Sequence, residues 1–172
     1  MDDDALKIGE YEEGDIVEII AIESDSYPTP WSENIFRNEI TSPISRMLVG
    51  RTAKGEKGGV WGYIVYWRVD DEVHLHNVAV RRDMRRKRIA SRLLEEAIRR
   101  CRWEGARRAT LEVRRSNLPA QKMYEKFGFT VEGMRPGYYR DTGEDALIMW
   151  ADLSRLCPEG YAAAGEADIK NA

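Results

Sequence analysis

Cysteine and histidine are scarce in this sequence. Its 172 residues include two cysteines, Cys101 and Cys157, and two histidines, His74 and His76. The cysteines follow no metal-binding or redox spacing, and we expect them to be reduced thiols of a cytosolic protein. No third Cys or His ligand lies near the two histidines, so we expect no metal site. The composition argues against a disulfide-stabilised module and against a metalloprotein.

Long apolar runs are also missing. No segment approaches the roughly 20 apolar residues that a membrane-spanning helix needs, so we expect no membrane partner. The chain opens with acidic residues rather than with a basic patch and an apolar run, which gives no sign of a secretory signal peptide. These absences predict a soluble, cytoplasmic protein.

The length of the chain favours one domain with a sizeable core over two small ones. Hydrophobic residues make up 42% of it, as in ordinary globular proteins. We assign residues 1–156 to this domain. Residues 157–172 are rich in alanine, glycine and polar residues, and we expect them to form a flexible tail.

The net charge of −3 hides two segments of opposite sign. Residues 1–26 carry ten acids and one lysine, whereas residues 81–108 carry twelve Arg or Lys against four acids, net +8. Such a basic block favours an anionic partner, either a nucleic acid or a phosphorylated cofactor. A solvated helix face would have the same composition, so charge alone does not decide among the three.

The spacing of apolar residues predicts both helices and strands. Helices are expected after Asp15 and Ser32, from Ile89, and from Asn117 to a terminating Gly128. The expected strands are 47–52, 60–69, 72–80, 109–114, 129–134 and 146–153, with a loop at 136–144. In strand 72–80, alternation places Val73, Leu75 and Ala79 on one face and His74, His76, Val78 and Val80 on the other. This order predicts a single α/β domain, a mixed sheet with helices on both faces.

The segment from Val78 to Leu94 runs from a strand through a basic loop into an amphipathic helix. The free backbone N–H groups and the dipole of a helix N-terminus favour phosphate binding. The residues placed to hold a pyrophosphate there are Arg85, Arg86, Lys87, Arg88, Ile89, Ala90 and Ser91. A basic surface turn without a ligand would show the same pattern.

Several segments resemble GNAT N-acetyltransferases. Val78-Ala79-Val80 followed by Arg85–Ala90 is similar to the coenzyme A signature of that superfamily, Arg/Gln-x-x-Gly-x-Gly/Ala. Leu111–Asn117 and Tyr124–Phe129 resemble its second half. Two further pieces, Pro30-Trp31-Ser32 and Gly137-Tyr138-Tyr139, resemble the ribosomal-protein alanine acetyltransferases and the archaeal protein N-terminal acetyltransferases. The resemblance extends over residues 6–153.

The resemblance implies a GNAT-type domain, with a mostly antiparallel sheet and a central pair of parallel strands that splay apart. It implies acetyl-CoA as cosubstrate, without a metal. The implied acceptor is the N-terminal α-amine of a protein or peptide, with a ribosomal protein as a candidate. The basic block then coincides with the cofactor loop, so we expect no nucleic-acid partner.

Acetyl transfer to an amine needs a base for the amine and a proton donor for the departing thiolate. Glu112 and Tyr124 are the candidates. By pattern alone, Glu112 is equally a surface acid of an edge strand, and Tyr124 a core tyrosine bonded to a backbone carbonyl. The resemblance implies that Glu112 is the general base, acting through water, and Tyr124 the general acid. It implies an auxiliary base role for His74, and we expect His76 to line the cleft.

The resemblance also assigns the binding residues. The backbone of Val78, Ala79 and Val80 is expected to pair with the pantetheine arm like a neighbouring strand, and Asn117 to bond that arm, although a simple helix cap would look the same. The residues expected to flank the peptide N-terminus are Pro30, Trp31, Tyr138 and Tyr139. Ordinary loop packing is the alternative for these four.

Arg88 departs from the family signature, which has glycine at this position. If the backbone there needs a positive φ, arginine costs about 1 kcal/mol or somewhat more. If the backbone is helical, arginine is free and adds a cation near the phosphates. We favour the helical backbone.

Three other functions compete with N-terminal acetylation. A small-amine acetyltransferase would close the groove between residues 28–34 and 136–144. A non-catalytic coenzyme A-binding regulator would lack Glu112 or Tyr124. Nucleic-acid binding through residues 81–108 would show a steep salt dependence.

Overall fold

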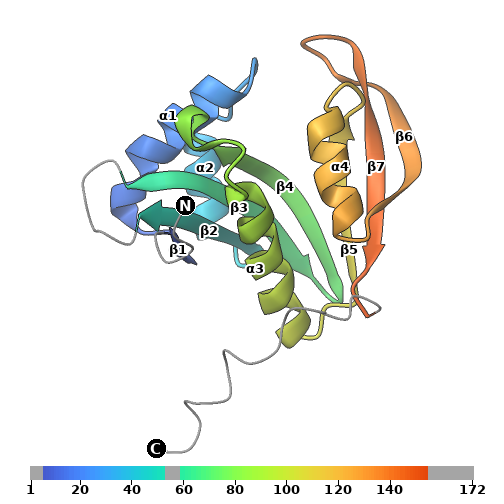
Figure 1. The fold of residues 1–172 in the computed structure, drawn as a ribbon, viewed down its shortest axis with the longest axis horizontal. Helices are drawn as coiled ribbons and strands as arrows, with labels where there is room; N and C mark the ends of the chain where they lie inside the picture. The colour runs from blue at the N-terminus through green and yellow to red at the C-terminus, as the bar shows by residue number, and fades with distance from the viewer. Residues whose placement is uncertain (1–5, 53–58, 155–172) are drawn as a thin grey trace, which may run out of the picture.

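The computed structural model describes residues 6–52 and 59–154 (Figure 1). The helices within these ranges are α1 (Ile16–Ser26), α2 (Glu33–Thr41), α3 (Ile89–Trp103) and α4 (Leu118–Lys126). The strands are β1 (Leu6–Glu10), β2 (Ser45–Thr52), β3 (Val60–Val69), β4 (Glu72–Val80), β5 (Arg108–Arg114), β6 (Thr130–Tyr139) and β7 (Glu144–Asp152). The predicted tail at 157–172 and Cys157 lie outside the described residues.

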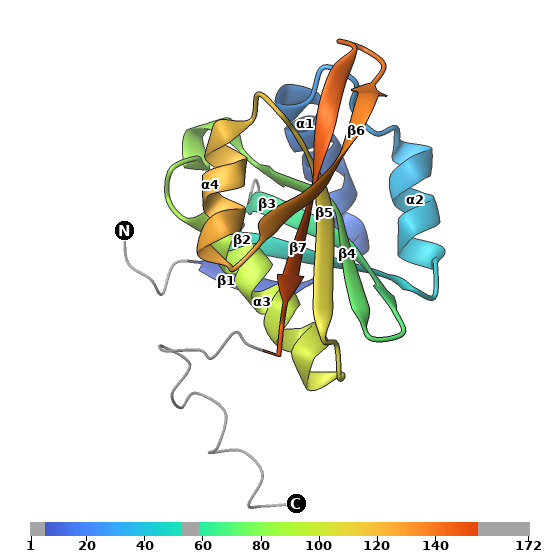
Figure 2. The same ribbon diagram turned by 90° about the vertical axis from the view of Figure 1, so that its right-hand side faces the viewer.

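The strands form one sheet of order β1-β2-β3-β4-β5-β7-β6, in which only the neighbours β4 and β5 are parallel. Helices α1 and α2 cover one face, and α3 and α4 cover the other (Figure 2). The predicted mixed, mostly antiparallel sheet with helices on both faces is confirmed.

Each face of the sheet has its own apolar core. On the α3 side, the apolar face of the predicted amphipathic helix is buried: Ile89, Leu93, Leu94, Ala97, Ile98 and Cys101. On the other side, Ile19 of α1 and Phe36 of α2 pack around the buried ring of Tyr63. Full burial of a side chain such as Leu93 stabilises the fold by about 1.5–3 kcal/mol. The helices are thereby fixed on the strands that carry the candidate site.

The parallel pair separates partway along its length. Only Glu72–Leu75 of β4 pair with Arg108–Leu111 of β5. Beyond these residues, β4 stays with β3 and β5 stays with β7, and the gap between the two widens in Figure 1. The expected splayed strand pair is confirmed.

A bulge in β4 overturns the predicted faces of this strand. Val65 of β3 pairs with Asn77 and the next residue pairs with Leu75, so His76 is an extra residue. One extra residue exchanges the two faces of a strand beyond it. Val78 and Val80 therefore pack in the core below α3, and Ala79 packs on the α1 side, opposite to the alternation we expected.

The C-terminal hairpin also differs from the sequence prediction. The expected loop at 136–144 is mostly strand, because β6 continues to Tyr139 and β7 begins at Glu144. Pro136 is tolerated there since β6 is an edge strand. The short edge strand β1 was not predicted.

Candidate active site

Glu112 lies on β5, beyond the point where β4 and β5 separate. Its carboxylate forms an ion pair with Arg135 of β6, with Oε1 and Nη1 2.9 Å apart. The hydroxyl of Tyr138 hydrogen-bonds the same carboxylate, which raises the pKa of Tyr138. The Glu112 side chain is 28% exposed, so it faces the solvent side of the gap rather than the core. A partly exposed acid at the open end of the split sheet suits a base that works through water.

Three tyrosines from different elements lie near one another. Tyr27 follows α1, Tyr124 lies in α4 and Tyr139 ends β6. Burial raises the pKa of all three, that of Tyr139 to about 12. Tyr139 interacts electrostatically with Tyr124 on one side and with Glu112 on the other. Tyr139 therefore lies within electrostatic reach of both Glu112 and Tyr124.

The hydroxyls of Tyr124 and Tyr27 differ in their partners. Tyr124 is 7% exposed and its ring packs edge-on against Phe129 at 5.8 Å, but its hydroxyl has no hydrogen-bond partner within residues 6–52 and 59–154. Tyr27 donates its hydroxyl to the carbonyl of Val78 at 2.6 Å. Tyr124 thus lacks the backbone bond that a purely structural tyrosine was expected to make, and burial raises its pKa.

The two histidines occupy different environments. His74 lies where β4 and β5 are still paired, and its Nε2 is 3.1 Å from the Glu72 carboxylate. His76, the bulge residue, stacks on Trp67 with ring centroids 4.1 Å apart. Burial on that side lowers the pKa of His76, while Glu112 acts in the opposite direction. Glu39 opposes this shift more strongly than Glu112 does, and the auxiliary base role of His74 stays a prediction.

The loop before α3 contains two arginines with left-handed backbone, Arg86 at φ 65° and Arg88 at φ 62°. Our prediction of a helical Arg88 was wrong, because this residue is the turn that directs the chain into α3 and not part of the helix. For a residue other than glycine, that conformation costs about 1–2 kcal/mol. The first N–H groups of α3 lack intrahelical partners and lie directly after this turn.

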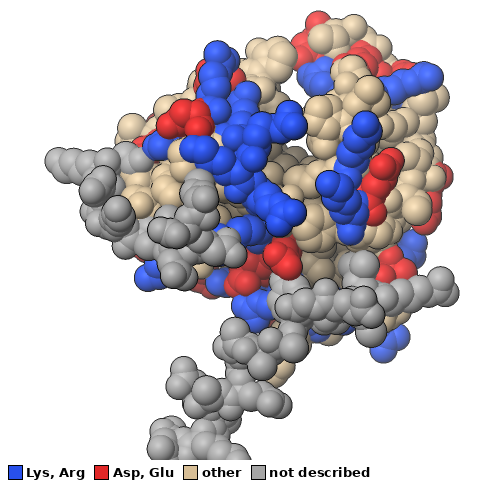
Figure 3. Space-filling view, viewed as in Figure 1, with Lys and Arg blue, Asp and Glu red and all other residues tan. Residues whose placement is uncertain are grey.

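Arg85 binds the protein itself. Its Nε donates to the Val80 carbonyl at 3.0 Å and its Nη2 to the Ser26 hydroxyl at 3.0 Å. The side chains of Arg86, Lys87 and Arg88 are exposed. In Figure 3, basic side chains gather over this loop and the start of α3, and a second basic strip runs over α4 across a hollow. The loop thus combines one structural arginine with a cluster of exposed cations.

The backbone of β4 presents polar groups to the gap. Arg81 donates its amide to the Trp61 carbonyl at 2.9 Å, which makes these residues a hydrogen-bonded pair. Because hydrogen-bonded and non-bonded pairs alternate in an antiparallel ladder, Val78 and Val80 direct their N–H and C=O groups away from β3. The two carbonyls already accept bonds from Tyr27 and Arg85, so the two amides are what this edge offers to a ligand.

The predicted substrate residues lie in two segments, the connection between α1 and α2 and the end of β6. Pro30 is exposed and Tyr138 is 43% exposed. Trp31, in contrast, packs half-buried on Phe36 with ring centroids 5.4 Å apart. Asn117 caps α4, since its Oδ1 accepts from the Ala120 amide at 3.3 Å. Of the four residues predicted to flank the peptide, Trp31 therefore has a packing role as well.

Glu23 was missed by the sequence analysis. It is 1% exposed and accepts hydrogen bonds from the Tyr63 hydroxyl, from Asn77 at 3.2 Å and from the Trp31 amide at 2.8 Å. It therefore ties the segment after α1 to β3 and β4. The available signal was an acid on the apolar face of α1, in line with Ile16 and Ile19.

Taken together, the sheet opened between two parallel strands and the basic loop leading into a helix indicate an acyl-transfer enzyme. Residues 16–129 match the family model described as "Acetyltransferase (GNAT) family", and the chain belongs to this family. A Bacillus subtilis relative with the provisional name ribosomal protein bS18-alanine N-acetyltransferase is 38% identical over 141 residues, 81% of this chain and 91% of the relative.

Solved structures of acetyltransferases share the fold of this chain. The ribosomal-protein-S18-alanine N-acetyltransferase from Escherichia coli aligns with a TM-score of 0.78 at 30% identity, over 91% of this chain and 99% of that one. Ard1 from Thermoplasma volcanium aligns with a TM-score of 0.75 at 27% identity, over 86% and 97%. The resemblance inferred from the motifs is confirmed.

Two absences concern only the part of the chain that the structure describes. In the described residues, no group of three or more His, Cys, Asp or Glu side chains is placed to share a metal ion. None of the described helices is both long and apolar enough to cross a membrane.

Proposed function

We propose that this protein transfers the acetyl group of acetyl-CoA to the N-terminal α-amine of a protein or peptide. The observation that carries the proposal is the split between β4 and β5, with Glu112 directly beyond the last paired residues and Tyr139 within electrostatic reach of both Glu112 and Tyr124. The names of the Bacillus and Escherichia relatives support a ribosomal protein as acceptor. A ribosomal acceptor would place the enzyme in the cytoplasm.

The chain offers groups that suit each part of acetyl-CoA. The amides of Val78 and Val80 face the gap and suit the pantetheine arm, which has amide groups of its own. The N-terminus of α3 and the cations of residues 85–91 suit the pyrophosphate. Asn117 lies at the start of α4 on the other side of the gap, and its cap bond to Ala120 leaves its NH₂ group for the arm.

In the proposed reaction, Glu112 accepts a proton of the α-amine through a water molecule. The amine nitrogen forms a bond to the acetyl carbonyl carbon, and the carbon–sulfur bond breaks. Tyr124 gives its proton to the departing thiolate, which leaves as a free thiol. The Tyr124 hydroxyl is protonated at neutral pH, as in any tyrosine, so it has a proton to give to the thiolate.

The test is incubation with acetyl-CoA and a library of short peptides that differ in their first residue. Mass spectrometry should locate the label on the α-amine, with a preference among first residues. The matched peptides with a blocked α-amine and a free internal lysine should remain unlabelled. Labelling of polyamines or amino acids in place of peptides would favour the small-amine alternative, and coenzyme A binding without any transfer would favour the regulator.

A further inference from the structure

We propose that Arg114, Asp141 and Thr29 form a clasp that holds together the two segments flanking the acceptor site. The catalytic consequence of the clasp rests on the proposed function. The clasp itself rests on hydrogen bonds and ion pairs in the structure. The two segments are the connection between α1 and α2, which carries Thr29, and the hairpin between β6 and β7, which carries Asp141. Arg114 is assigned as a positioning residue.

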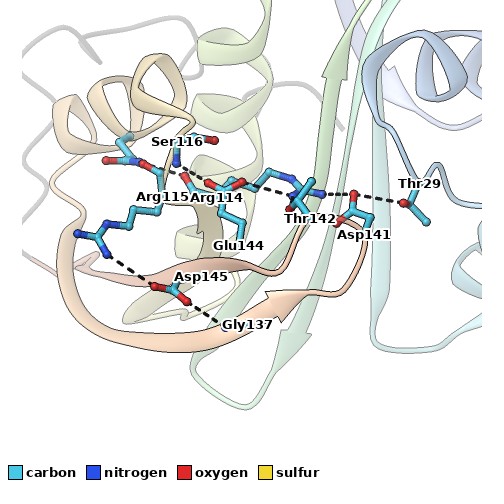
Figure 4. A network of polar contacts seen from close by, with 10 residues as sticks. Thr29, Arg114, Arg115, Ser116, Gly137, Asp141, Thr142, Glu144 and Asp145 are labelled. Atoms are coloured by element: carbon cyan, nitrogen blue, oxygen red, sulfur yellow. Dashed lines mark hydrogen bonds and ion pairs between the residues drawn. The ribbon is translucent and has the colours of Figure 1, made fainter.

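Arg114 binds the tip of the hairpin in several ways at once (Figure 4). Its Nη2 donates to Asp141 at 2.7 Å and its Nη1 to the Thr142 hydroxyl at 2.9 Å. The same nitrogen lies 3.5 Å from Glu144, and the guanidinium stacks over the ring of Tyr139 at 3.9 Å. With its side chain 20% exposed, Arg114 is largely enclosed by the hairpin that it holds.

The clasp crosses from the hairpin to the other half of the molecule through one carboxylate. The Asp141 oxygen that accepts from Arg114 also accepts from the Thr29 hydroxyl at 3.2 Å, across 112 residues of sequence. Thr29 stands between Tyr27, which binds β4, and Pro30, a predicted substrate residue. Asp141 thus links β5, the hairpin and the segment after α1.

The base of the hairpin has separate anchors. Glu144 accepts from the Ser116 amide at 2.6 Å, and Asp145 accepts from the Gly137 amide at 2.9 Å. These bonds fix the base whether or not the clasp is closed. The tip beyond Tyr139 therefore depends on Arg114, Asp141 and Thr29 for its contacts with the rest of the molecule, and Arg114 also covers the ring of Tyr139.

A clasp of this kind preorganises the acceptor site. Opening it would leave the tip to be ordered by the peptide, so binding would weaken. Asp141→Asn and Thr29→Val should each raise the KM for peptide about threefold to tenfold, the range of one or two hydrogen bonds. The kcat and the KM for acetyl-CoA should stay within about twofold, since neither variant touches the proton transfers or the cofactor loop.

Glu96→Gln is the matched control. Glu96 is a carboxylate of nearly the same exposure, 20% against 19% for Asp141, and it also pairs with arginines, but it lies on α3 away from both segments. This variant should leave all kinetic constants unchanged. A KM change of the same size in Glu96→Gln would mean a general charge effect and would overturn the clasp.

Hydrogen exchange tests the clasp without activity. In the free enzyme, Thr29→Val should speed amide exchange in residues 139–143, although the substitution is far from them in sequence. Unchanged exchange there, or a lower peptide KM, overturns the proposal. If wild type acetylates no peptide but the exchange result holds, the clasp stands and the proposed function fails.

Discussion

At the scale of single residues, Glu112 and Tyr124 are proposed to carry out different proton transfers. A peptide α-amine has a pKa of about 7.7–8.0, so most of it is protonated at neutral pH. Glu112→Gln removes the base, so kcat/KM should fall most at low pH and recover in part as pH rises. A pH–rate profile with a peptide substrate measures this. Arg135→Gln breaks the same ion pair but keeps the carboxylate, and a similar pH-dependent loss in it would contradict the base role.

The Tyr124→Phe variant should lose activity in a different way from Glu112→Gln. Loss of one acid–base group lowers kcat about 10²-fold, and alkaline pH should not restore it. Because burial holds the pKa of Tyr124 above its usual 10, the wild-type kcat should show no alkaline decline from this group below that pH. Tyr27→Phe is the control, since that hydroxyl is bound to the Val78 carbonyl and not free to donate. Full kcat in Tyr124→Phe would rule out the proposed acid and make His76 and His74 the next residues to test.

Arg88 combines a backbone cost with a charge near the predicted phosphate site. Arg88→Gly relieves the left-handed strain and should raise the free energy of unfolding by about 1 kcal/mol. It should change coenzyme A affinity by no more than about tenfold, because backbone N–H groups are expected to carry most of the phosphate contact. Urea denaturation and calorimetry measure the two effects. Arg88→Ala loses the same cation but keeps the strain, so equal stability of both variants would contradict the backbone argument.

At the scale of elements, the sequence predicted most where burial and periodicity agree. The bounds of β3 and β4 and the inner row of α3 are as expected. The bulge at His76 was invisible, because apolar side chains stand at both Val78 and Ala79 and either register buries one of them. The length of β6 was missed since Pro136 is a strand breaker except at an edge. Clusters such as Tyr27 with Tyr124 come from distant elements, which single-sequence periodicity does not connect.

The hairpin of β6 and β7 is expected to contribute to binding of the acceptor peptide and not to binding of the cofactor. Tyr138 contacts Glu112, and Tyr139 lies under Arg114. The double variant Tyr138→Ala, Tyr139→Ala should raise the KM for peptide by about tenfold or more while leaving coenzyme A affinity nearly unchanged. Steady-state kinetics measures the KM for peptide, and calorimetry measures the affinity for coenzyme A. Trp103→Ala removes an aromatic ring that is 87% exposed on α3 and should change neither. An equal loss of both affinities would indicate a folding defect or a cofactor role for the hairpin.

At the scale of the whole molecule, the sheet consists of two parts joined over a short length. β1 to β4 form one part and β5 to β7 the other, and between them the register extends only from Glu72 to Leu75 on β4. α3 connects the two in sequence, and its apolar row contributes to the core that both share. A ligand in the gap would contact both parts, because Val78 and Asn117 lie on opposite sides of it. Cofactor binding and global stability should therefore be coupled.

This coupling gives a prediction for the intact protein. Coenzyme A at about 100 times its Kd should stabilise the fold by about 2.7 kcal/mol, which for a domain of this size raises Tm by about 5–11 °C. Pantetheine, which lacks the phosphates, should give a much smaller shift at the same concentration, because the N-terminus of α3 and the cations of residues 85–91 would have no partner. Thermal unfolding with each ligand measures both shifts. Equal shifts with the two ligands would mean that the basic loop does not hold the pyrophosphate. No shift with millimolar coenzyme A would mean that the folded protein does not bind it and would overturn the cofactor assignment, because any ligand that binds only the folded state stabilises that state.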